Sequence, residues 1–156
     1  MEEGLEEAVR AKTGPMKVVS KILCLMHDHY SLFLLKNCLC LPKLLYILRC
    51  SAVWKFPEVL KEFDEVVRSS LAEITNIQMS AEPWRQATFP VGLGGLGIRR
   101  TEEVALPAFL ASIHSVQKLV LSILPGAASD SETDLALTRW TFLSCVISSE
   151  PGTFLF

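Results

Sequence analysis

Apolar residues recur every three or four positions along most of the chain, which is the spacing of a helix with one buried face. The clearest run is residues 57–74, where Pro57 suits the first turn of a helix. The apolar stripe of this run consists of Phe56, Val59, Leu60, Phe63, Val67, Leu71 and Ile74. Asp64 and Arg68 are four positions apart on the polar side, so we expect them to form a solvated ion pair.

Shorter runs with the same spacing predict further helices over residues 2–12, 16–26, 28–39, 43–50, 101–121 and 135–147. Gly14 and Pro15 should end the first of these helices. Thr101 should cap a later one, which Pro107 should kink or restart. We therefore predict a mainly α protein, a helical bundle of about six helices with a short glycine-rich turn or hairpin in the middle.

The composition divides the chain into three parts. Residues 1–14 form an acidic N-terminal segment, and residues 15–148 carry the helical pattern of a single domain. Residues 149–156 stop on apolar side chains without a cap, so we interpret them as a truncated tail.

The most irregular stretch is WRQATFPVGLGGLGIRR, residues 84–100, whose four glycines are Gly92, Gly94, Gly95 and Gly97. Because glycine adopts positive φ at no steric cost, we expect a sharply turning joint between two helical blocks. Trp84 should plug this joint against the helix at residues 57–74. Five apolar side chains should anchor the turn on the core: Phe89, Val91, Leu93, Leu96 and Ile98.

Three of these glycines also match G-x-G-x-x-G, the fingerprint of dinucleotide-binding proteins. That fingerprint needs a strand before it, a helix after it and an acidic residue about 20 positions later. Here Pro90 breaks the short preceding run, and the acids Glu102 and Glu103 come far too early. We therefore expect no cofactor and interpret the glycines as structural.

The charge is unevenly distributed along the chain. The formal net charge is −2, yet residues 11–55 hold one acid, Asp28, against Lys12, Lys17, Lys21, Lys36, Lys43, Arg49 and Lys55. A basic block of this kind can face a phosphate backbone. Its cations can equally be solvated on exposed helix faces, and the sequence leaves both interpretations open.

No catalytic or metal-binding set stands out. The aspartates include no adjacent pair that could hold magnesium, and no G-x-S-x-G motif occurs. Cys24 and His27 are one helical turn apart, but Cys38 and Cys40 are too close together and too leucine-flanked for a structural zinc site. We therefore expect neither enzyme activity nor a bound metal.

The cysteines and the apolar content bear on location and partners. Five cysteines, an odd count without a secretory signal before them, indicate reduced thiols and an intracellular protein, with nucleus and cytoplasm both open. The most apolar window, residues 31–48, contains Lys36, Pro42 and Lys43, so we expect no membrane span. Half of the residues are apolar, which favours self-association through exposed apolar faces.

Four segments occur in a specific order: DHYSLFLLKNCLCLPKLLYILRC (28–50), the helix with Phe63-Asp64 and Val67-Arg68, WRQATFPVGLGGLGIRR (84–100) and ALPAFLAS (105–112). Together they resemble the region after the polymerase palm in reverse transcriptases of non-LTR retrotransposons, over roughly residues 16–145. The resemblance implies a helical thumb and connector in which Lys36, Lys43 and Arg49 face the nucleic-acid backbone. The family's catalytic aspartate motif, fingers and endonuclease are absent from this chain.

Two functional hypotheses follow. The first is a non-catalytic fragment or descendant of such a reverse transcriptase, which binds RNA or an RNA–DNA hybrid weakly through its basic helical block. The alternative is a helical protein-interaction module, or a relic without a selected function.

Overall fold

The fold is a mainly α bundle, as predicted, and the computed structural model describes residues 2–126 and 131–149. Its α-helices are α1 (Glu2–Leu23), α2 (Asp28–Leu34), α3 (Leu41–Cys50), α4 (Pro57–Thr75), α5 (Ala81–Thr88), α6 (Thr101–Ile123) and α7 (Ser131–Ser149). Three short helical turns join them: η1 (Leu35–Leu39, a π-helix), η2 (Val53–Lys55) and η3 (Val91–Leu93). The predicted tail after residue 149 lies outside the described residues.

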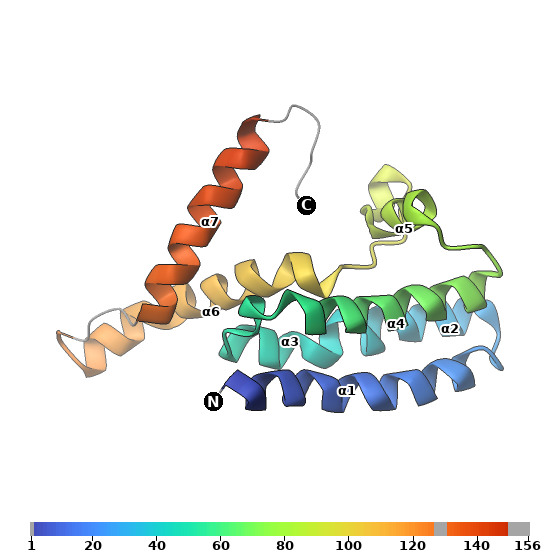
Figure 1. Ribbon diagram of the computed structural model, residues 1–156, viewed down its shortest axis with the longest axis horizontal. Coiled ribbons are helices and arrows are strands. Elements are labelled where there is room, and N and C mark those ends of the chain that lie inside the picture. The colour runs from blue at the N-terminus through green and yellow to red at the C-terminus, as the bar shows by residue number, and fades with distance from the viewer. Residues whose placement is uncertain (1, 127–130, 150–156) are drawn as a thin grey trace.

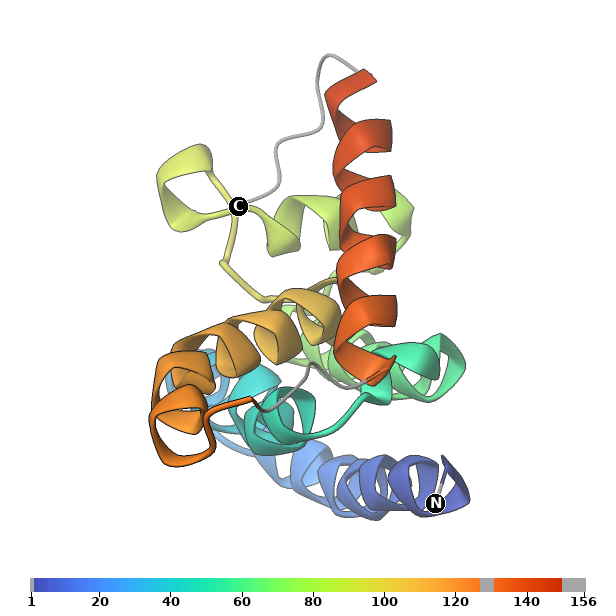
Figure 2. The same ribbon diagram turned by 90° about the vertical axis from the view of Figure 1, so that its left-hand side faces the viewer.

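The centre of the bundle is built by α1, α3, α4 and α6. Helix α1 packs along α4, and α3 packs along α6, while α5 and the glycine-rich joint lie at the other end of the bundle from α7 (Figure 1). Helix α7 extends away from the bundle (Figure 2) and contacts it mainly through α6. This arrangement leaves the α6–α7 corner far less covered than the centre.

The predicted helix over residues 57–74 is confirmed as α4, and its apolar stripe forms the middle of the core. Phe63 and Leu71 are fully buried, and the neighbouring stripe residues are nearly so. On the side facing α1, the buried hydroxyls of Ser20 and Ser70 lie 2.6 Å apart. Small polar side chains at this contact allow the two helices to approach closely, and each hydroxyl has a hydrogen-bond partner.

The predicted break at Gly14 and Pro15 is wrong, because α1 runs through both residues without interruption. The buried face of α1 continues across the proline: Val9, Thr13, Met16, Ser20 and Leu23. A proline inside a helix leaves the carbonyl four residues earlier without its N–H donor. That carbonyl belongs to Ala11, an exposed residue, so water can satisfy it while the packing of α1 on α4 holds the helix together. The predicted boundary between residues 1–14 and 15–148 therefore falls within one helix.

Pro107 likewise does not restart α6. Helix α6 is continuous from Thr101 to Ile123, and the carbonyl that loses its donor belongs to the exposed Glu103. The last helix also begins earlier than predicted, at Ser131 rather than Leu135. In both cases the helix extends beyond the limits that the apolar pattern indicates.

Two stretches are long and apolar enough to cross a membrane, by length and composition alone: Asp28–Cys50 and Thr101–Ile123. The first is composed of α2, η1 and α3, and its inward side chains Leu35, Leu44 and Leu48 belong to the core. Core helices of globular proteins pass the same test. The expectation of no membrane span therefore stays a prediction.

Candidate functional site

The glycine-rich joint folds back over the end of α5. The amide groups of Leu96 and Ile98 both donate to Ala87 O, and Gly97 N donates to Phe89 O at 2.8 Å. Gly94 and Gly97 have positive φ values of 79° and 69°, a conformation that favours glycine. These backbone bonds close the end of α5, and the side chain of Gln86 adds a bond to Gly94 O at 2.8 Å.

Gly95 and Gly92 differ sharply in their surroundings. A Cβ atom added to Gly95 would lie 2.0 Å from Phe89 O and 2.7 Å from Gln86 O, whereas one added to Gly92 would meet nothing within 4 Å. Gly92 also lacks a positive φ. Among the four predicted structural glycines, the geometry therefore gives a reason for Gly94, Gly95 and Gly97 and none for Gly92.

The predicted anchoring of the joint is correct at Ile98 and wrong at three of the other positions. Ile98 is buried and Phe89 is half-buried, whereas Val91 and Leu93 are each more than 60% exposed, and Leu96 is exposed as well. Since the loop is held by its own hydrogen bonds, its outer side chains do not need a core to pack on. Trp84 is 8% exposed and belongs to the main apolar core, as its predicted structural role requires.

The three residues proposed to face nucleic acid do not converge. Lys36 is half-buried on η1, and its Nζ lies 3.0 Å from the position of a Cβ on Gly97, so it covers the joint. Lys43 is in the first turn of α3 and Arg49 in the last, six residues apart and thus about 120° apart around the helix. Within residues 2–126 and 131–149, none of the three takes part in an ion pair.

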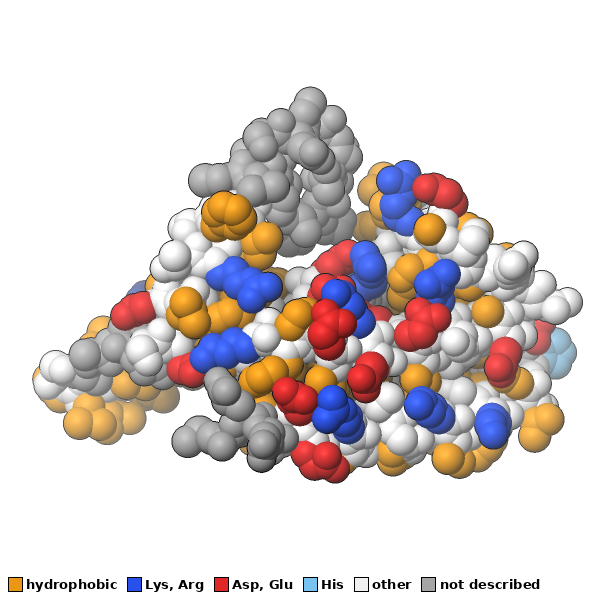
Figure 3. Space-filling view, in the orientation of Figure 1, with side chains coloured by type: hydrophobic (Ala, Val, Ile, Leu, Met, Phe, Trp, Pro, Cys, Tyr) orange, Lys and Arg blue, Asp and Glu red, His pale blue; other side chains and the backbone are white. Residues whose placement is uncertain are grey.

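Acidic side chains lie among the cations of the basic block, residues 11–55. Lys55 donates to Glu132 of α7, and its ammonium lies 5.9 Å from the centre of the Trp54 ring. Basic and acidic side chains alternate on the face in Figure 3, which includes much of α1 and α4, so this face carries no continuous positive surface. The charge excess of residues 11–55 is therefore spread over several faces of the molecule.

A buried carboxylate, which the apolar pattern of the sequence does not reveal, joins α4 to α6. Asp64 Oδ1 accepts hydrogen bonds from Thr101 N and from Thr101 Oγ1, both at 2.8 Å, and Asp64 Oδ2 accepts one from Glu102 N at 3.2 Å. A carboxylate at this place satisfies the unpaired amides of a helix N-terminus and opposes its positive dipole end. Asp64 is thus the cap of α6, supplied from 37 residues earlier in the chain.

Two predictions are corrected by this cap. Asp64 does not pair with Arg68; the guanidinium of Arg68 instead donates to Met79 O at 2.6 and 2.8 Å and contacts Glu65. Thr101 is not the cap but the first residue of α6, and its own amide is capped. A spacing of four residues brings Asp64 close to Arg68 on the helix. It cannot show that the carboxylate turns inward toward another helix.

Burial dominates the pKa of Asp64. Loss of hydration raises the pKa of this carboxyl, and the hydrogen bonds from Thr101 and Glu102 together with the charge of Arg100 lower it only in part. Burial also raises the pKa of the nearby Cys40 thiol to about 12, with a smaller contribution from Asp64. Cys40 is therefore an inert thiol at neutral pH.

A groove of about 840 Å³ lies between α6 and α7. Its walls are mainly apolar and include Leu110, Ile113, Val116, Val120, Leu137 and Trp140. On the outside of the same stretch of α6, Leu119 is 61% and Ile123 is 68% exposed. The α6–α7 corner thus presents both an apolar groove and, beside it, an apolar ridge formed by Leu119 and Ile123.

Among the described residues, no three His, Cys, Asp or Glu side chains are arranged so that they could hold a metal ion. Cys24, Cys38, Cys40 and Cys50 are free thiols, and Cys24 Sγ lies 3.1 Å from a Glu73 carboxylate oxygen. His27 and His29 stack on each other at the start of α2. These groups occupy separate places and do not form one chemical site.

No family model matches the sequence, and no curated protein or solved structure shows significant similarity to it.

Proposed function

We propose that this protein is a non-catalytic helical interaction module, and that it associates with a second copy of itself through the α6–α7 corner. The main observation in support of this proposal is that the apolar groove and the apolar ridge lie side by side on one surface. Large exposed apolar patches mark interaction sites on folded proteins. In a two-fold symmetric pair, each copy would place its ridge residues Leu119 and Ile123 into the groove of the other.

This proposal predicts that Leu119→Glu weakens self-association, because it places a charge on the ridge. Light scattering coupled to size-exclusion chromatography over a range of concentrations measures the effect. We expect the parent protein to form a dimer and the variant to remain a monomer at concentrations at which the parent is paired.

The matched control is Leu25→Glu, which charges an equally apolar and still more exposed residue after α1. It should leave the dimer unchanged, since Leu25 lies away from the α6–α7 corner. A parent protein that stays monomeric at all concentrations would contradict the proposal, and so would an equal loss of association in both variants.

A second proposal is weak binding of RNA or an RNA–DNA hybrid by a retroelement-derived module. Its support is the sequence resemblance together with the exposure of several cations: Lys12, Lys17 and Lys21 on α1 and Arg49 on α3. Since phosphate contacts release counterions, the affinity for a hybrid duplex should fall steeply as salt is raised. An affinity that does not change with salt concentration would exclude binding through phosphate contacts.

Single substitutions refine this test. Lys43→Gln and Arg49→Gln should each reduce the slope of log affinity against log salt by about one. Lys61→Gln is the control, because Lys61 is already held by Glu58 on α4. Equal effects of all three substitutions would indicate a general effect of net charge rather than contacts from α3.

A further inference from the structure

A second, smaller pocket lies beside the groove, nearer to the start of α6. Its volume is about 390 Å³, which is sufficient for a small organic molecule. It lies between η2, the start of α4, α6 and α7, and Pro107 and Trp140 separate it from the groove. Its walls combine apolar side chains with two arginines, Arg100 and Arg139.

Two wall residues carry buried hydrogen-bond donors without a partner. Trp54 is only 4% exposed, and its indole Nε1 has no acceptor; Arg100 Nε is buried and also has none. Buried N–H groups without an acceptor are rare in folded proteins and cost free energy. Both N–H groups lie behind the wall surface in this conformation, so an acceptor oxygen of a ligand reaches them when the side chains rotate toward the pocket.

The charges around the pocket favour an anionic acceptor. Arg139 Cζ lies 5.6 Å from the centre of the Trp54 ring, and in the described part of the chain no acid pairs with Arg139. The two acids of the wall already have cations beside them: Glu103 bonds Arg100 and Glu102 lies near Lys61. Arg139 is thus the cation left for a ligand.

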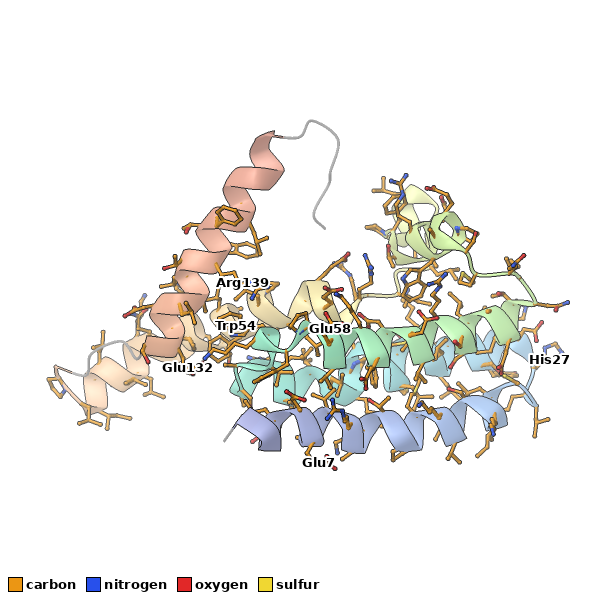
Figure 4. All side chains as sticks on the ribbon, in the orientation of Figure 1. Glu7, His27, Trp54, Glu58, Glu132 and Arg139 are labelled. Carbon is orange, nitrogen blue, oxygen red and sulfur yellow. The ribbon has the colours of Figure 1, made fainter. Side chains whose placement is uncertain are left out.

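The side chains at the start of α7 form another part of the surroundings of the pocket. Trp54 lies there close to Arg139 and Glu132 (Figure 4). Glu132 is not part of the pocket wall; its Oε1 accepts from Lys55, and its Oε2 is buried without a hydrogen-bond partner. Leu60, Leu106 and Leu143 form an apolar side of the pocket that suits a hydrocarbon or aromatic body.

We propose that this pocket binds a carboxylate attached to an apolar group. The carboxylate accepts from Arg139 and from the unpaired donors of Trp54 and Arg100, while its apolar body packs between Trp140 and the leucines. A small organic acid and the free C-terminus of a peptide ending in an apolar residue share this chemistry. The pocket shares Pro107 and Trp140 with the α6–α7 groove, but the polar residues proposed to hold the carboxylate, Trp54, Arg100 and Arg139, line only the pocket.

The indole N–H resonances of isotope-labelled protein provide a direct test. The chain has three tryptophans, and Trp54→Phe identifies the Trp54 signal while keeping an aromatic wall. We expect naphthalene-2-carboxylate to shift the Trp54 signal and the uncharged naphthalene-2-carboxamide to leave it in place. Arg139→Gln should weaken binding of the carboxylate roughly tenfold or more, because it removes a charged hydrogen bond.

The matched control is Arg85→Gln, since Arg85 is another exposed arginine stacked on an aromatic ring, that of Phe89, at the opposite end of the molecule. It should leave binding unchanged. The peptide Gly-Gly-Phe with a free or an amidated C-terminus then shows whether the site takes chain ends or only small acids. A carboxamide that shifts Trp54 as strongly as the carboxylate, no shift with either compound, or undiminished binding by Arg139→Gln would overturn the proposal.

Discussion

Gly95→Ala is expected to destabilise the protein by about 3 kcal/mol or more, since the new methyl group has no room. It would meet the carbonyl oxygens of Phe89 and Gln86, which belong to the backbone and cannot rotate away as a side chain could. Relief requires the loop to move, which breaks the hydrogen bonds from residues 96–98 to the end of α5. Because Trp84 and Ile98 connect this loop to the core, the loss should be seen in global unfolding.

Thermal unfolding measures this prediction, with Gly92→Ala as the control. A loss of 3 kcal/mol corresponds to a melting temperature lower by roughly 6–12 °C for a chain of this size. Gly92→Ala should melt like the parent, because its methyl group meets open space and its φ is not positive. Two variants that melt at the same temperature would show that the joint does not support the fold.

Asp64→Ala is expected to lower the free energy of unfolding by about 2–4 kcal/mol, because it removes the cap of α6 and leaves buried donors unpaired. Thr101 is 1% exposed, so water cannot readily replace the lost oxygen at its amide and hydroxyl. Asp64→Asn should cost less than Asp64→Ala, since its carbonyl oxygen can still accept from Thr101, although its NH2 group cannot accept from Glu102 N as the second carboxylate oxygen does. Urea unfolding of the parent and both variants measures the order.

The control for this series is Glu65→Ala, on the next residue of α4. Glu65 forms only an exposed ion pair with Arg68, so its removal should cost less than about 1 kcal/mol. A loss for Asp64→Ala no greater than that for Glu65→Ala would mean that the cap does not stabilise α6.

The raised pKa of Asp64 predicts a specific pH dependence. A carboxyl whose pKa is higher in the folded state takes up its proton first in the folded state, which stabilises the fold as pH falls. The stability difference between the parent and Asp64→Ala should therefore grow as the pH is lowered from 7 through the folded-state pKa toward about 4. Unfolding measurements at several pH values give this difference, in which the other titrating groups largely cancel. A difference that shrinks on acidification would show that the hydrogen bonds outweigh burial.

The regular parts of the fold could be predicted because local sequence determines them. The stripe from Val59 to Ile74 has one period and one buried face, and it forms α4 in the structure as predicted. The turn at Gly94, Gly95 and Gly97 was predictable for the same reason, because backbone conformation depends on residues that are neighbours in the chain.

Features that depend on contacts between distant residues could not be predicted. The continuity of α1 through Pro15 depends on packing against α4, and the inward position of Asp64 depends on the amides of α6. The groove and the pocket depend on the angle at which α7 leaves α6. The separation of Lys36, Lys43 and Arg49 likewise follows from the π-helical turn and from the position around α3.

Local sequence patterns are sufficient to show that the protein is helical, where its strongest amphipathic helix lies, and that a glycine-rich joint interrupts the helices. These properties follow from the period of apolar residues and from local backbone freedom. The tertiary structure alone decided which polar groups are buried and paired, which prolines are tolerated and which apolar side chains stay exposed. These depend on the positions of partners far apart in the chain, because hydrogen bonding and burial are satisfied between helices and not within a sequence window.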